Sequence, residues 1–197
     1  MTPPNHVLSL SGVADALERL GVTYHIGGSV ASSQHGKGRS TLDVDIVADL
    51  KDEHVALLCA ALRRDYYVDE DAMREAVRAR HAFNAIHFGT MLKIDVFVAG
   101  HAPYDREELR RAVPRPLVAA PDARAFPVKS AEDVVLRKLE WYRAGGEVSV
   151  TQWQDVLNVV RVQAHDFDVE YCRRWAPVLG VADLLEALLA EAGTYGD

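Results

Sequence analysis

The chain has 197 residues, of which 49% are hydrophobic and 26% charged, a length that suits one domain or a compact domain with a helical appendage. Its 22 basic and 29 acidic residues give a formal net charge of −7, which argues against a protein that coats long nucleic acids, because such proteins are usually basic. No run approaches the 18 or so consecutive apolar residues of a membrane-spanning helix. The N-terminal residues lack the features of a signal peptide, and Cys59 and Cys172 suit reduced packing positions, so we expect a cytoplasmic protein without a membrane partner.

A turn rich in small residues follows the first predicted strand. Apolar spacing predicts a helix over residues 7–20 and a strand over 22–26, directly before Gly27, Gly28 and Ser29. Glycines let the backbone approach a phosphate closely, and a hydroxyl with free amides at a helix start can bind its oxygens. The sequence therefore predicts a phosphate-binding turn, with a short helix after it.

Two aspartates on one strand come next. After a polar loop that contains Arg39, the alternation around Asp43, Val44 and Asp45 predicts a strand with both carboxylates on one face. Neighbouring carboxylates repel each other, and a hard divalent cation such as Mg²⁺, or Mn²⁺ in its place, supplies the counter-charge. Arg39 is either a triphosphate contact or a solvated loop residue.

A third acid lies within a later strand. The run 91–98 alternates so that Asp95 and Lys93 share the face opposite its apolar residues, and a two-residue turn at 89–90 predicts a hairpin with the strand 82–88. An acid in an apolar strand is costly unless it is paired, so we expect Asp95 beside Asp43 and Asp45. Lys93 either contacts phosphate or neutralises the acidic cluster.

The remaining segments frame these residues. A polar helix over 69–78 carries arginines that suit either RNA phosphates or a solvated face, and His87 suits a structural role better than a catalytic one. The stretch 114–128 contains four prolines and predicts irregular strand and loop. From Ser130 the apolar period becomes helical and predicts four helices. The expected architecture is α+β, a mixed sheet flanked by helices over 1–128 followed by a helical bundle over 129–197.

These motifs resemble those of a known group of enzymes. Gly27-Gly28-Ser29, then Asp43-Val44-Asp45, then Asp95 is similar to the signature of the polymerase-β-type nucleotidyltransferase superfamily, with a long gap between turn and aspartates. Within it, the chain looks most like the small bacterial AbiEii/MenT toxin-type transferases. That resemblance implies that Arg39 binds phosphate, that Lys138 does likewise, and that Asp155 orients Lys138 or the substrate. The alternative for Lys138 and Asp155 is an ion pair between helices.

The resemblance implies transfer of a nucleoside monophosphate from an NTP, ATP among them, to an acceptor hydroxyl. The three aspartates bind the metal, and the turn, Arg39, Lys93, Lys138 and Asp155 bind the nucleotide. The acceptor is a tRNA or RNA 3′ end, a protein or a small molecule such as an antibiotic, and the resemblance to toxin-type enzymes favours a tRNA or a protein. A toxin would have an antitoxin partner. The alternatives are a nucleotide-binding module without turnover and a phosphohydrolase.

Overall fold

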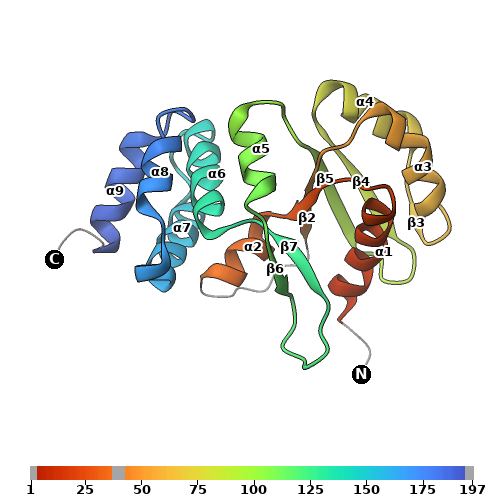
Figure 1. Ribbon diagram of the computed structural model, residues 1–197, viewed down its shortest axis with the longest axis horizontal. Helices are drawn as coiled ribbons and strands as arrows, with labels where there is room; N and C mark the ends of the chain where they lie inside the picture. The colour runs from red at the N-terminus through yellow and green to blue at the C-terminus, as the bar shows by residue number, and fades with distance from the viewer. Residues whose placement is uncertain (1–3, 37–42, 194–197) are drawn as a thin grey trace. The chain divides into compact units, whose positions relative to one another are not determined.

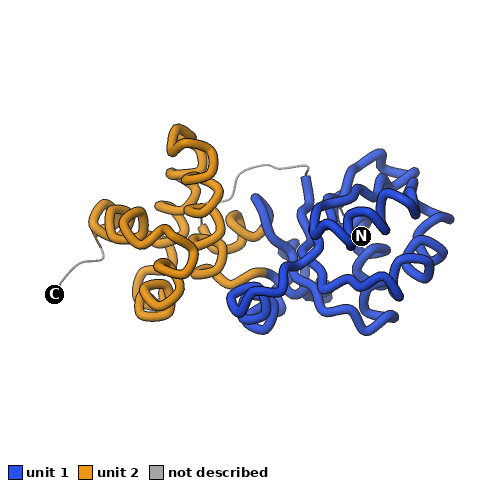
Figure 2. Tube along the Cα trace, turned by 90° about the horizontal axis from the view of Figure 1, so that it is seen from above, with its two compact units in different colours: residues 1–30, 40–128 blue, residues 31–39, 129–197 orange. Residues whose placement is uncertain are grey.

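The computed structural model describes residues 4–36 and 43–193. Contacts within the chain divide it into two compact units (Figure 2). The first unit comprises Met1–Val30 and Ser40–Val128, and the second comprises Ala31–Arg39 and Lys129–Asp197. The division falls within the short helix α2 (Gly28–His35), which follows the first strand directly.

The first unit is built on a mixed sheet (Figure 1), which within the described residues has seven strands in the order β3-β4-β5-β2-β1-β7-β6. In chain order these are β1 (Tyr24–Ile26), β2 (Val44–Ala48), β3 (Tyr66–Tyr67), β4 (Ala82–His87), β5 (Lys93–Val98), β6 (Val113–Pro116) and β7 (Ala125–Val128). β2 pairs parallel with β5 and antiparallel with β1, while β4 and β5 are antiparallel. The two aspartate-bearing strands are therefore direct neighbours.

Alternation along the central strands decides which face is buried. Val44, Ile46 and Ala48 of β2 are buried, and so are the matching positions of β5. Helix α1 packs against β4 and β5, α4 packs against β4, and α3 contacts α1 and α4. The helices of this unit other than α2 are α1 (Asn5–Arg19), α3 (Asp52–Leu62), α4 (Glu70–Ala79) and α5 (Pro103–Arg110). Each fully buried aliphatic side chain stabilises this packing by roughly 1.5–3 kcal/mol.

Helices make up the second unit, and the first of them after α2 starts after Ser130, as the sequence predicted. The described helices beyond α2 are α6 (Ala131–Ala144), α7 (Val150–Gln163), the 3₁₀ turn η1 (Ala164–Asp166), α8 (Val169–Trp175) and α9 (Ala182–Ala192). Ser130, Ser149 and Asp168 each accept a hydrogen bond from a backbone amide in the first turn of the following helix. These caps satisfy amides that have no partner within the helix.

Two local predictions need correction. The β4–β5 connection spans residues 88–92 rather than a two-residue turn, because Thr90 binds back to the strand end: its hydroxyl accepts from the Leu92 amide and contacts His87 Nδ1 at 3.0 Å. The proline-containing stretch forms a hairpin of β6 and β7, with Pro114 and Pro116 on β6 at the edge of the sheet. An edge strand tolerates proline, since one side of it has no neighbour that needs an amide donor.

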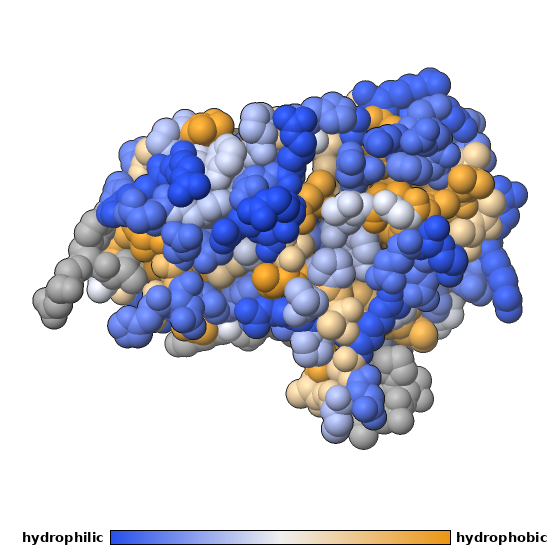
Figure 3. All heavy atoms as spheres, in the orientation of Figure 1, coloured by the Kyte–Doolittle hydropathy of each residue, from blue (hydrophilic) through white to orange (hydrophobic). Residues whose placement is uncertain are grey.

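The surface is largely hydrophilic. Hydrophilic residues cover most of the face shown in Figure 3, with smaller hydrophobic areas between them. Across the described residues, no helix combines the length and the apolar character needed to span a bilayer. Cys59 and Cys172 are buried and are not joined in a disulfide, as expected.

Candidate active site

The turn after β1 and the aspartate strand β2 touch each other. The Gly27 amide donates a hydrogen bond of 2.8 Å to the carbonyl oxygen of Asp45. A Cβ atom added at Gly28 would lie 1.6 Å from Asp45 Oδ2, well inside van der Waals contact. Gly28 also has a φ of +55°, a left-handed conformation that glycine adopts at little cost. Backbone at Gly28 and the Asp45 carboxylate are therefore in direct contact, and any larger residue at position 28 requires the Asp45 side chain to move.

Polar side chains form a row across three neighbouring strands. In the sheet register Asp45 of β2 is paired with Asp95 of β5, and Asp95 is paired with Asn84 of β4. Paired residues on adjacent strands point to the same face and lie about 5 Å apart. We call Asp45, Asp95 and Asn84 the polar row. The sequence assigned both aspartates to the site, whereas Asn84 stood out only as a polar residue in an otherwise apolar strand and was given no role there.

Lys93 lies beside this row. Its ammonium group donates a hydrogen bond to Asp95, with 2.8 Å between Nζ and Oδ2. The pKa of Lys93 is raised above its usual value, first because of this hydrogen bond and further because of the charges of Asp95, Asp43 and Asp45, while burial opposes the rise. Of the two roles predicted for Lys93, the structure contains the ion pair with an acid. The row thus carries its own counter-charge.

Two further predicted site residues, Asp43 and Arg39, are not part of the polar row. Asp43 is exposed and comes one residue before β2, so it shares the strand face of Asp45 but lies outside the ladder. Arg39 lies outside the described residues. Within 4–36 and 43–193, no group of three or more histidine, cysteine, aspartate or glutamate side chains is arranged to hold a metal ion. The carboxylates that the sheet brings together are the pair Asp45 and Asp95.

This donor set fits a magnesium ion. Mg²⁺ prefers oxygen ligands and is commonly held by one or two carboxylates together with substrate phosphates rather than by a cage of protein ligands alone. Asp45 and Asp95 supply the carboxylates, and the turn at Gly27 and Gly28 adjoins Asp45. The hydroxyl of Ser29 and the first amides of α2 lie at the same turn.

The second unit contains the predicted lysine and aspartate as a pair. Lys138 of α6 donates to Asp155 of α7, with 2.8 Å between Nζ and Oδ2. Both side chains are largely buried, at 9% and 13% exposure. The structure therefore brings Lys138 and Asp155 together as an ion pair between helices. Their roles toward phosphate and substrate stay predictions.

A buried pair in the first unit had no counterpart among the predictions. His25 of β1 is fully buried, and its Nε2 lies 3.7 Å from Oε1 of Glu108 on α5, which is also buried. His25 is paired with Val47, two residues after Asp45 on β2, so the contact joins α5 to the strand that leads into the turn. The available signal was a histidine inside the apolar run 22–26.

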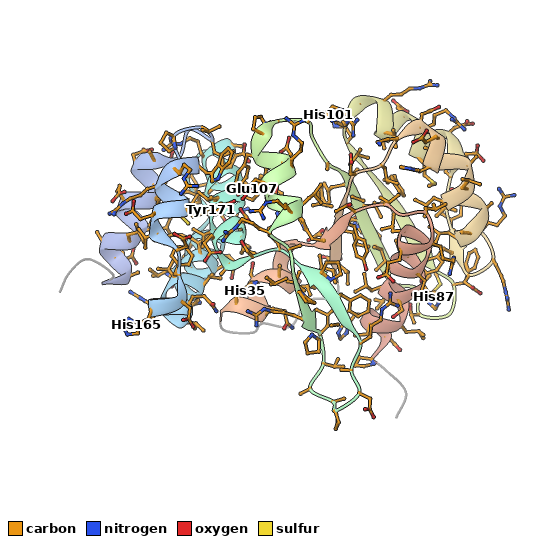
Figure 4. The ribbon with its side chains drawn as sticks, in the orientation of Figure 1. His35, His87, His101, Glu107, His165 and Tyr171 are labelled. Carbon is orange, nitrogen blue, oxygen red and sulfur yellow. The ribbon has the colours of Figure 1, made fainter. Side chains whose placement is uncertain are left out.

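Other polar residues serve the fold. His87 is at the end of β4 (Figure 4), where it bonds Thr90 and packs edge-on against Tyr66 at 5.0 Å. Arg74 hydrogen-bonds the carboxylates of Asp52 and Glu70. The structural role expected for His87 agrees with these contacts, and the arginine helix has its charge partly neutralised by its own neighbours.

Comparisons with solved structures identify the fold. The solution structure of the antibiotic-resistance factor ANT(2'')-Ia matches with 16% identity and a TM-score of 0.52, over 96% of this chain and 97% of that one. A nucleotidyltransferase-like antigenic protein from Paracoccidioides brasiliensis matches with 16% identity and a TM-score of 0.53, over 94% and 91%. ANT(2'')-Ia in complex with adenylyl-2''-tobramycin matches with 16% identity and a TM-score of 0.50, over 97% and 98%. No family model and no curated protein matches the chain.

The chain therefore has the nucleotidyltransferase fold, a mixed sheet flanked by helices with further helices after it. This confirms the fold class expected from the sequence, and the resemblance to the polymerase-β-type superfamily stays a prediction. The narrower resemblance to AbiEii/MenT enzymes stays a prediction.

Proposed function

We propose that this protein is a metal-dependent nucleotidyltransferase, which moves a nucleoside monophosphate from an NTP to an acceptor hydroxyl. The observation that carries the proposal is the contact of the Gly28 backbone with the Asp45 carboxylate, in a strand whose register partner is Asp95. A phosphate-binding turn and a carboxylate pair thus share one place in a nucleotidyltransferase fold. Low sequence identity makes the fold, rather than the activity, the common property with the solved structures.

The reaction follows from what each group can bind. The turn residues Gly27, Gly28 and Ser29 bind the triphosphate through amides and a hydroxyl. The acceptor oxygen forms a bond to the α-phosphorus, the bond from that phosphorus to the bridging oxygen breaks, and pyrophosphate leaves. Asp95 is proposed to take up the proton of the acceptor hydroxyl as its oxygen attacks.

The proposed metal site uses the aspartates next to this turn. Asp45 and Asp95, with Asp43 next to the strand, would hold Mg²⁺ or Mn²⁺, which when bound stabilises the negative charge that develops on the phosphate oxygens. Lys93, paired with Asp95, limits repulsion among these carboxylates. Lys138, oriented by Asp155, is proposed to bind phosphate, and this role rests on the sequence resemblance. Arg39 is proposed as a further phosphate ligand on the same basis.

The charge of the protein bears on the acceptor. A net charge of −7 repels a long polyanion and favours a neutral or cationic acceptor, and the arginines of α4 are engaged with acids. We therefore place a small molecule with a free hydroxyl, such as an antibiotic, first among acceptors. The structure of ANT(2'')-Ia with adenylyl-2''-tobramycin, in a chain of matching fold and length, supports this order.

A second candidate is transfer to an RNA 3′ end or a protein, as in a toxin controlled by an antitoxin. The observation that favours it is the order of Lys138 and Asp155 after the aspartates, which resembles the toxin-type enzymes. A toxin would stop growth when it is expressed alone and be rescued by its antitoxin. Harmless overexpression would remove this candidate.

The deciding experiment follows the labelled nucleotide. Each α-³²P-labelled NTP is incubated with Mg²⁺ and the protein, with an aminoglycoside and lincosamide panel, total tRNA or lysate protein as acceptor. We expect label on one acceptor class, together with release of pyrophosphate, and loss of both in Asp95→Asn. Label on none, with NTP binding intact by calorimetry, would indicate a nucleotide-binding module without turnover. Free NMP formed without acceptor would indicate a phosphohydrolase.

A further inference from the structure

Lys93 lies beside the carboxylates of the polar row. β5 alternates so that Lys93 and Asp95, two residues apart, point to the same face of the sheet. The Lys93 ammonium bonds Oδ2 of Asp95 at 2.8 Å, although the lysine side chain is 45% exposed and has water available. The register partner of Asp95 is Asp45. One oxygen of the carboxylate pair is therefore already bound to a positive charge supplied by the chain itself.

The neighbouring charges make this position more than an ordinary surface pair. Continuing the parallel register of β2 and β5 by one residue places Asp43 opposite Lys93. Asp43, Asp45 and Asp95 all add to the electrostatic field at the lysine. Three negative charges thus act on one ammonium group.

We propose that Lys93 is a built-in counter-cation that competes with the divalent metal for Asp95, and so sets how tightly the metal binds. This inference rests on the proposed function, because that function brings the metal to these carboxylates. In the metal-free protein, Lys93 holds the repelling carboxylates together. When metal and nucleotide bind, the ammonium leaves Asp95 Oδ2, and its exposure gives the long side chain room to move toward solvent or phosphate.

The competition has a direction that can be measured. Removing the positive charge of Lys93 makes the carboxylate pair more negative, so a divalent cation binds more tightly. For partly exposed charges a few ångströms apart we expect affinity to rise about three- to tenfold. The same change leaves the metal-free protein with uncompensated repulsion, so its melting temperature falls in chelator.

The experiment uses Mn²⁺ as the probe, with the full chain and without substrate turnover. Calorimetry and the electron paramagnetic resonance of free Mn²⁺ give affinity and stoichiometry for the natural protein, Lys93→Met and Lys93→Arg. Lys51→Met is the matched control, because it removes the same charge at an exposed residue before α3. Melting in chelator and in saturating Mn²⁺ is recorded for each protein.

We expect Lys93→Met to bind Mn²⁺ more tightly and to gain more in melting temperature on Mn²⁺ addition than the natural protein. Lys93→Arg and Lys51→Met should stay close to natural values. Equal or weaker Mn²⁺ binding by Lys93→Met would overturn the inference and leave the proposed function standing. Absence of Mn²⁺ binding in every protein would overturn the inference and count against metal dependence itself.

A double variant covers the case in which Lys93→Met does not fold. The single variant Asp95→Asn is compared with the double variant Lys93→Gln/Asp95→Asn. Both lack the partner of Lys93, so the repulsion between Asp95 and its neighbouring carboxylates is already relieved. If Lys93 acts through Asp95, the lysine substitution changes Mn²⁺ affinity by less than twofold in the Asp95→Asn background. A full three- to tenfold effect that persists without Asp95 would show that Lys93 acts by general charge alone, and the proposal would fail.

Discussion

Two lysine–aspartate ion pairs, one in each unit, have the same distance between nitrogen and oxygen but differ in how exposed their side chains are. Lys93 and Asp95 lie on one strand with side-chain exposures of 45% and 17%, while Lys138 and Asp155 join two helices at 9% and 13%. Both have 2.8 Å between Nζ and Oδ2. An exposed pair exchanges its partners with water and ions at little cost, whereas a buried pair leaves an unpaired charge in the interior when it is broken. The first pair therefore suits exchange with a ligand, and the second suits permanent support.

The largest expected effect lies in the polar row and concerns activity. Asp45→Asn should lower nucleotidyl transfer about a thousandfold or more, because a neutral amide is a poor substitute for a metal-binding carboxylate. Its unfolding free energy should stay equal or rise slightly, since one of two repelling charges is gone. Rates and urea unfolding are compared with Asp49→Asn, which makes the same charge change at the end of the same strand. Full activity in Asp45→Asn would remove the row from the site.

Breaking the buried pair of Lys138 and Asp155 tests whether it supports the stability of the second unit. Lys138→Met should cost about 3 kcal/mol of unfolding free energy, because Asp155 is left charged among helices. That corresponds to a fall of roughly 6–12 °C in melting temperature for a chain of this size. Asp155→Asn and the double variant Lys138→Met/Asp155→Asn complete a double-mutant cycle. We expect the double variant to lose less unfolding free energy than the two single variants lose together. A cost below about 1 kcal/mol would mean that water reaches the pair and that the two pairs are alike.

Gly28→Ala should lower both stability and activity, because it changes the turn that contacts Asp45. Two costs combine, the left-handed φ and the overlap of the new methyl group with the Asp45 carboxylate, so we expect a loss of about 1–3 kcal/mol and a fall in activity. Gly21→Ala is the matched control, since Gly21 has a φ of +68° and nothing within 4 Å of the added atom. Equal losses of stability and activity in the two variants would show that Asp45 moves aside freely.

The smallest expected effect is a difference in how the stability contributions of the two ion pairs depend on salt concentration. Lys93→Met should change unfolding free energy by less than about 1 kcal/mol at low ionic strength, and the difference should shrink further near 1 M salt. The effect of Lys138→Met should hardly depend on salt, because mobile ions do not reach a buried pair. Denaturant unfolding of both variants at two salt concentrations measures this. A salt-independent loss in Lys93→Met would place its pair in the same class as the helix pair.

The sequence predicted the two strands of the site and, from the cost of an unpaired acid, that Asp95 lies beside Asp45, but it did not predict the register that pairs them. Period-two alternation was enough to predict that Asp45 faces away from Val44 and Ile46, since that pattern is local. The pairing of Asp45 with Asp95 joins residues 50 positions apart in a parallel ladder, and no local pattern specifies such a register. The contact of Gly28 with Asp45 has the same origin, because it depends on the antiparallel pairing of β1 with β2.

Other differences come from side chains that override local rules. The β4–β5 turn is longer than Gly89 and Thr90 suggested, because Thr90 finds partners at His87 and Leu92. The hairpin of β6 and β7 was hidden by prolines that an edge strand tolerates. The pairing of Lys138 with Asp155 needed the packing of α6 on α7, which the helical period permits without specifying partners.

The hydrogen bond from the Gly27 amide to the Asp45 carbonyl makes that amide a spectroscopic reporter. The proton sits on the turn, while its acceptor belongs to the residue whose carboxylate faces the site. Any ligand that pulls on the Asp45 side chain or shifts the turn changes the length of this bond, and the ¹H and ¹⁵N frequencies of Gly27 change with it. Only 13 of the 197 residues are glycines, whose amide nitrogens resonate apart from most others. A titration followed at this one resonance can therefore read the state of the site without any label placed in it.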